Sequence, residues 1–216
     1  MIMRFLVACL FTVLFNSSAF AAVINVTVDG KTMPWLSNAT LNSSFAYGIG
    51  DGLGPVVVDS SSGINFVPGG SLIITRVSGL TSAFTGPPTV DGLGYTILGA
   101  ANDNPGSSGQ LFPSAFAPAD WDTLLMALMG TFADSTGAIV GTPFEVGNAR
   151  SIVIPVGATR LQLGLNDDIF ADNTGALNLT ISGPNPVVVP PTVPVPGTLV
   201  LLGLGLPMLL NRRRRR

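Results

Sequence analysis

The chain lacks histidine altogether and has a single cysteine, Cys9, among its 216 residues. Histidine is needed for Ser–His and Cys–His nucleophile pairs, and histidine and cysteine supply most of the protein ligands of zinc. These absences argue against the common hydrolase mechanisms and against a zinc site. Charged residues are also scarce, at 10% of the chain, whereas 26 glycines and 17 prolines predict a fold rich in turns.

Residues 1–21 have the pattern of a secretory signal peptide. Arg4 precedes an apolar run from Phe5 to Phe15, and Ala19-Phe20-Ala21 is a small-x-small cleavage sequence. We therefore predict cleavage before Ala22 and export of the mature chain. Cys9 lies inside this segment, so the exported protein is expected to contain neither a free thiol nor a disulfide.

The C-terminal end has three consecutive parts that predict a sorting tail. Residues 184–197 are rich in proline and valine, residues 198–210 are mainly apolar, and the chain ends in Arg212, Arg213, Arg214, Arg215 and Arg216. Within residues 198–216 we expect a transmembrane helix at 198–210, followed by a short cytoplasmic tail of arginines. Before processing, this helix would hold the protein at the membrane.

This tail resembles the PEP-CTERM sorting signal. Pro194, Val195 and Pro196 stand where the commonest form of that signal has Pro-Glu-Pro. The resemblance implies processing by an exosortase-type enzyme. It also implies a final location on the cell surface or in the extracellular space of a bacterial envelope.

Without these two ends the chain is acidic. Its 12 acidic residues face only four basic ones, Lys31, Arg76, Arg150 and Arg160, so the expected exported domain has a net charge of about −8. Nucleic-acid binding needs clustered lysine and arginine for the phosphates, so we expect no nucleic-acid partner. An acidic domain is instead compatible with divalent cations.

Residues 22–183 contain many short apolar runs separated by turn residues, which predicts one all-β domain, a β-sandwich or jelly roll. The clearest strand candidates are Val23 to Val28, Val56 to Val58, Ser71 to Val77, Tyr95 to Leu98, Ile152 to Pro155, Leu161 to Leu165, and Leu177 to Ile181. The stretch from Trp121 to Phe132 allows a short helix as well, because Trp121, Leu124, Leu125 and Leu128 have helical spacing.

The segment Asn166 to Gly175, between the last two predicted strands, concentrates oxygen ligands. Asp167, Asp168 and Asp172 offer carboxylates, and Asn166 and Asn173 offer amide oxygens. Ca²⁺ binds such oxygens, typically about six to eight at once, although the spacing is not that of an EF-hand. Asn, Asp and Gly are also favoured in any turn, so these residues alone leave open a calcium loop and a solvated acidic hairpin tip.

The pattern G-L-N-D-D-x-F-x-D-N-x-G, from Gly164 to Gly175, resembles the C-terminal calcium loop of the PA-I-like galactose-binding lectin family. The resemblance implies a small jelly-roll β-sandwich and one Ca²⁺ bound by Asp167, Asp172 and Asn173. It favours a buried strand from Leu125 to Phe132 over the helix. In that family the hydroxyls of a sugar complete the coordination of the metal.

The same resemblance implies two backbone carbonyl ligands. One falls at Ile169 or Phe170, of which we select Phe170, and the other at Ala83, with Phe84 as the alternative. The family's founding member contacts sugar through histidine and glutamine in the segment that corresponds to Thr85 to Gly94. This chain has no histidine, so its sugar need not be galactose.

These observations predict an exported calcium-dependent carbohydrate-binding protein that acts on extracellular polysaccharide, with Asp167 and Asp172 next to the ligand. The alternative is a structural surface or matrix protein that uses calcium only for stability. We expect no enzymatic activity. A glycosidase-like pair of Asp167 or Asp168 with Glu145 would need a cleft between the two carboxyls, and no part of the sequence indicates one.

Overall fold

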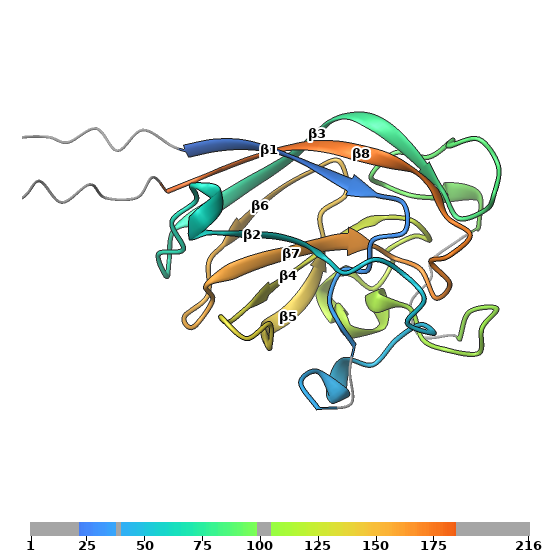
Figure 1. Cartoon of the computed structure of the whole chain (residues 1–216), viewed down its shortest axis with the longest axis horizontal. Helices are drawn as coiled ribbons and strands as arrows, with labels where there is room; N and C mark the ends of the chain where they lie inside the picture. Colours follow the sequence, from blue (N-terminus) through green and yellow to red (C-terminus); the bar gives the residue numbers. More distant parts are fainter. Residues whose placement is uncertain (1–21, 38–39, 99–104, 185–216) are drawn as a thin grey trace, which may run out of the picture. The chain divides into compact units, whose positions relative to one another are not determined.

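The fold consists of two four-stranded antiparallel sheets (Figure 1). The computed structural model describes residues 22–37, 40–98 and 105–184. The first sheet has the order β1-β8-β3-β6, formed by Ala22–Asp29, Thr174–Gly183, Ser71–Ser82 and Ala149–Val153. The second has the order β2-β7-β4-β5, formed by Val56–Asp59, Arg160–Leu165, Leu128–Ala133 and Ile139–Glu145. The all-β class expected from the sequence is confirmed.

The main apolar core is built from side chains of both sheets. In β8, Leu177, Leu179 and Ile181 are buried and alternate with the more exposed Asn178 and Thr180, as a period of two requires. They belong to one cluster with buried side chains of the second sheet, among them Val58, Leu128, Phe132, Leu161, Leu163 and Leu165. Burial of each large apolar side chain contributes about 1.5–3 kcal/mol to stability.

A second, smaller cluster holds the aromatic side chains of Trp35, Tyr47 and Phe170. The segment just before Trp35 passes very close to β7. A Cβ on Gly164, a residue of β7, would lie 2.3 Å from the backbone of Met33. This cover explains why β7 is buried at almost every position instead of alternating. Phe170 thereby fixes the acidic loop after β7 to the remainder of the domain.

Two of the predicted strands differ from the observed ones. Tyr95 to Leu98 is not a strand but leads into a 3₁₀ helix, Thr96–Leu98, whose three residues are exposed, so this apolar run is not part of a sheet. Ile152 to Pro155 overlaps β6 only at its end. The sequence did not predict strand β5, because Gly141 and Pro143 interrupt its apolar pattern. The strand tolerates proline because it lies at the edge of its sheet.

The expected buried strand from Leu125 to Phe132 is confirmed over most of its length. Strand β4 begins at Leu128 and all six of its residues are buried. It starts three residues late because Met126 has a left-handed backbone conformation, with φ of 64°, which interrupts the extended conformation and is uncommon for a residue other than glycine. The helical alternative is wrong.

The acidic segment is not a hairpin tip. Strands β7 and β8 belong to different sheets, so the chain between them crosses from one sheet to the other (Figure 1). Asn166, Asp167 and Asp168 are at most 3% exposed, which rules out the solvated turn.

The signal peptide at 1–21, the linker at 184–197 apart from Pro184, and the tail at 198–216 lie outside the described residues. These include Pro194, Val195, Pro196 and Arg212 to Arg216. Among the residues that the structure describes, no helix is long and apolar enough to span a membrane.

Candidate functional site

The loop after β7 borders a hollow of about 260 Å³. Asp167 and Asp168 line it from just after the end of β7, and Asp172 lines it from the turn before β8. The end of β3 brings Ala83 and Phe84 from the other sheet. The remaining lining residues are Ser107, Phe112, Leu125 and Ile169. The fold therefore gathers the predicted acids and the predicted carbonyl segment at one place, although 84 residues separate Ala83 from Asp167 in the sequence.

Three side-chain oxygens of this loop are buried without a hydrogen-bond partner. They are Oδ2 of Asp167, Oδ1 of Asp172 and Oδ1 of Asn173, which are the three predicted side-chain ligands. Within the described residues only three other buried side-chain polar atoms lack a partner, and these lie on Thr81, Arg160 and Gln162. Buried polar atoms are nearly always satisfied, so three such oxygens in one loop make it the candidate site for a bound partner.

Asp167 has an electrostatic environment that disfavours its charge. Burial raises the pKa of Asp167 to about 7, against the opposite effect of the Asn173 side chain and of the Ile169 and Asp168 N–H groups. Its Oδ1 accepts the N–H of Asp168 at 2.7 Å, while Oδ2 has no donor. A bound cation next to Oδ2 would supply the charge that the protein itself does not.

Two contacts from distant segments hold the loop in place. The carboxylate of Asp51 accepts the N–H groups of Phe170 and Ala171 at 2.9 and 3.1 Å. The Asn173 Nδ2 donates to the carbonyl of Gly30 at 3.0 Å, which leaves Oδ1 for another partner. Asp51 carries no local sequence signal for this role, and we did not predict it.

The other two polar residues of the loop have structural roles. Asp168 accepts the N–H of Ser108 at 2.8 Å, and a Cβ at Gly106 would lie 2.2 Å from its carboxyl carbon, so the loop around Gly106 packs directly on it. Asn166 accepts the N–H of Ser114 and donates to the carbonyl of Leu124. Their oxygens are thus used within the fold.

The structure also locates the residues whose backbone carbonyls are the predicted ligands. Ala83 follows the last ladder pair of β3 and β8, which is Ser82 with Thr174, and the Phe84 carbonyl accepts the Thr174 hydroxyl at 3.4 Å. The Phe170 carbonyl accepts the Asn173 N–H at 3.2 Å, whereas Ile169 lines the hollow. Ala83, Phe84 and Ile169 line the hollow, whereas Phe170 is not among its lining residues.

This set of donors fits a hard cation and not a soft one. It consists of two carboxylates, one amide oxygen and backbone carbonyls, which are ligands of Ca²⁺. The described part of the chain has no group of three His, Cys, Asp or Glu side chains arranged to hold a metal. Two acids alone are too few for calcium, so a calcium site here would also need the amide and the carbonyls.

Glu145 lies in a different hollow, of about 790 Å³, lined also by Asp120, Asp122 and Arg150. There the Arg150 guanidinium donates to Asp120 at 2.8 Å. Burial raises the pKa of Glu145 above its usual range. The structure does not bring Glu145 together with Asp167 and Asp168 across one cleft, so it does not form the carboxylate pair that the glycosidase alternative requires.

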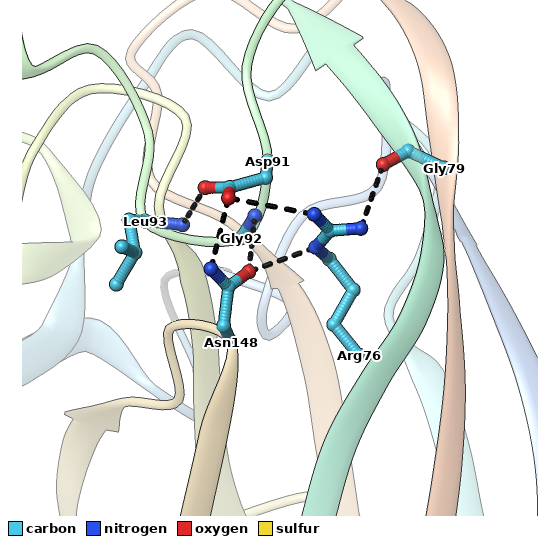
Figure 2. A network of polar contacts seen from close by, with 6 residues as sticks. All are labelled: Arg76, Gly79, Asp91, Gly92, Leu93 and Asn148. Carbon is cyan, nitrogen blue, oxygen red and sulfur yellow. Dashed lines mark hydrogen bonds and ion pairs between the residues drawn. The ribbon is translucent and has the colours of Figure 1, made fainter.

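Figure 2 shows a polar network that the sequence did not reveal. The Asn148 Oδ1 accepts from Arg76 Nε at 2.8 Å and from the Gly92 N–H at 3.1 Å, while its Nδ2 donates to Asp91 at 2.9 Å. Asp91 also accepts the Leu93 N–H and pairs with Arg76 at 3.4 Å. The side-chain oxygens and amide nitrogen at the centre of this network all have partners, so it needs no ligand.

No protein-family model, no curated protein and no solved structure matches the chain. The resemblances given above rest on the motif residues alone and stay predictions.

Proposed function

We propose that the protein is an exported, calcium-dependent carbohydrate-binding protein with a jelly-roll topology. The observation that supports this most is the set of three buried, unpartnered oxygens on Asp167, Asp172 and Asn173. Asp167 and Asp172 also line the open hollow. The three residues would hold Ca²⁺, together with the carbonyls of Ala83 and of Ile169 or Phe170. The role of the metal would be to bind two neighbouring hydroxyls of a sugar.

The number of ligands favours a place for sugar. The proposed set provides about five oxygens, whereas Ca²⁺ takes about six to eight. Two coordination positions would then be available to a vicinal diol. Binding through so few groups is expected to be weak for one site, with useful strength from many copies on one surface.

Calcium binding is tested first, by thermal unfolding of the full-length chain in saturating calcium and in chelator. At 100 times the dissociation constant a ligand adds about 2.7 kcal/mol, which corresponds to roughly 5–10 °C for a domain of this size. Asp167→Asn should abolish the shift. Asp122→Asn removes an exposed acid outside the loop and should leave the shift intact; equal midpoints for the unmodified chain would refute the site.

The alternative is a structural surface protein in which calcium only stiffens the loop. The buried loop after β7 and its contacts with Asp51 and Gly30 are compatible with that role. A glycan array in calcium and again in chelator separates the two functions. Calcium-dependent binding supports the lectin, whereas calcium binding with no glycan signal at high valency supports the structural protein.

We further propose that the C-terminal tail directs sorting. Residues 198–210 would retain the exported chain at the membrane until an exosortase-type enzyme cuts near Pro194 to Pro196. Intact mass of protein extracted from the cell surface tests this proposal. A mature form that still carries Arg212 to Arg216 would contradict it.

A further inference from the structure

The hollow beside the calcium loop has two chemically different parts. Asp167, Asp168 and Asp172 form the acidic part. The other lining side chains are apolar except for Ser107, namely Ala83, Phe84, Phe112, Leu125 and Ile169. Phe84 is 54% exposed, so a large aromatic surface stands in water at the edge of an anionic hollow.

Several contacts hold Phe84 in position. Its ring meets that of Tyr95 edge to face, with 6.0 Å between the centroids. Its N–H donates to the Ser82 hydroxyl at 3.2 Å, and that hydroxyl is 2.9 Å from the Tyr95 hydroxyl. The Thr174 hydroxyl donates to the carbonyl of Gly86 at 2.8 Å. A surface held in this way binds an apolar group without the cost of ordering a mobile side chain.

Hydrogen-bonding capacity is low on this side of the hollow. Among the residues that the structure describes, Ser107 is the only lining residue outside the acidic part with a polar side chain. A ligand hydroxyl pressed against the apolar part would lose water and find few partners, which is unfavourable, whereas a methyl group would bury apolar surface. The volume of about 260 Å³ also suits one sugar ring, since sites for larger ligands measure roughly 300–1,000 Å³.

We propose that the bound sugar is a 6-deoxyhexose whose methyl group lies against Phe84 and its apolar neighbours. This inference rests on the proposed function, in which the calcium holds the diol of the same sugar ring. The acidic part then recognises the diol, and the apolar part selects the methyl group over a hydroxymethyl group.

Matched sugar pairs test the inference by calorimetric titration of the full-length chain in calcium. Methyl glycosides of L-fucose and L-galactose form one pair, those of L-rhamnose and L-mannose another, and those of D-quinovose and D-glucose a third. Within each pair the ring configuration is constant and only the hydroxyl at carbon 6 differs. We expect the deoxy member of the pair that binds to have about tenfold higher affinity, the scale of one apolar group in a pocket.

Variants identify the source of the preference. Phe84→Ser should reduce the affinity ratio to about one, whereas Phe84→Leu should keep most of it. Val156→Ser, at a position that is 83% exposed and outside the hollow, should leave the ratio unchanged. Melting midpoints in chelator establish that each variant is folded.

The outcomes separate this inference from the proposed function. Equal or tighter binding of the 6-hydroxy sugars in calcium overturns the inference and leaves calcium-dependent sugar binding intact. The same holds if an array shows calcium-dependent binding only to glycans without a deoxy sugar, or if Phe84→Ser keeps the full preference. Absence of calcium-dependent binding to every glycan overturns the proposed function as well.

Discussion

Two polar clusters of this domain, the loop after β7 and the network around Asn148, differ in whether their side-chain polar atoms have hydrogen-bond partners. The central side-chain atoms of Asn148 and Asp91 each have partners. In the loop, Asp167, Asp172 and Asn173 each retain an oxygen without one. A saturated network stabilises the fold by itself, whereas an unsaturated buried cluster destabilises it until a partner binds.

The pKa values of Asp167 and Asp91 reflect the difference in hydrogen bonding between the two clusters. Burial raises the pKa of Asp167 to about 7. Burial would also raise that of Asp91, but hydrogen bonds from Asn148, Leu93 and Arg76, together with the Arg76 charge, hold it below its usual range. The comparison supports a structural role for the Asn148 network and a binding role for the loop as a proposal, and four variants test it.

The largest effect is expected from Asn148→Ala. The change removes three side-chain hydrogen bonds and leaves Arg76 and Asp91 with fewer partners, so we expect a loss of about 2–3 kcal/mol in the free energy of unfolding. Urea denaturation measures this loss. The stabilisation by calcium should be unchanged, and a reduced calcium shift would contradict the separation of the two clusters.

A smaller effect on stability, with a clear effect on calcium, is expected from Asp51→Ala. This exposed carboxylate accepts two N–H groups of the loop, so its removal should cost about 1–2 kcal/mol in chelator. The less ordered loop should bind calcium more weakly.

Asp51→Asn serves as the partial rescue, because the amide oxygen can still accept one of the two bonds. A calcium affinity that is the same in all three proteins would show that Asp51 does not position the loop.

The smallest effect concerns acid stability. The folded pKa of Asp91 lies below its unfolded value, so the carboxylate contributes stability above that unfolded value, about 3.9 for an ordinary aspartate, and the contribution is lost as pH falls through the folded pKa. Asp91→Asn should therefore reduce the free energy of unfolding at pH 6. At a second, acidic pH below the folded pKa of Asp91 it should make little difference. Unfolding curves at both pH values measure this; an equal loss at both would exclude the charge as the cause.

The sequence predicted the strands of the core well and their surroundings less well. Leu161, Leu163 and Leu165 alternate with small or polar residues, and a period of two suffices to predict a strand. The same rule failed at Tyr95 to Leu98, because an apolar run does not reveal whether a sheet has an edge for it. It also failed at β5, where glycine and proline conceal an edge strand.

What the sequence by itself determined is the available chemistry. Residues 22–184 contain neither histidine nor cysteine, so a metal site in this domain can use only oxygen donors, and Asn166 to Gly175 is where they are concentrated. Composition and local spacing are enough for that conclusion, because they do not depend on packing.

Only the tertiary structure decided which of those oxygens are open. Ser108 uses Asp168 and Ser114 uses Asn166, while Asp51 holds the backbone of the loop. These partners come from 60, 52 and 119 residues away. Contacts over such separations exist only because the two sheets pack together, and that packing leaves Asp167, Asp172 and Asn173 each with an unpartnered oxygen.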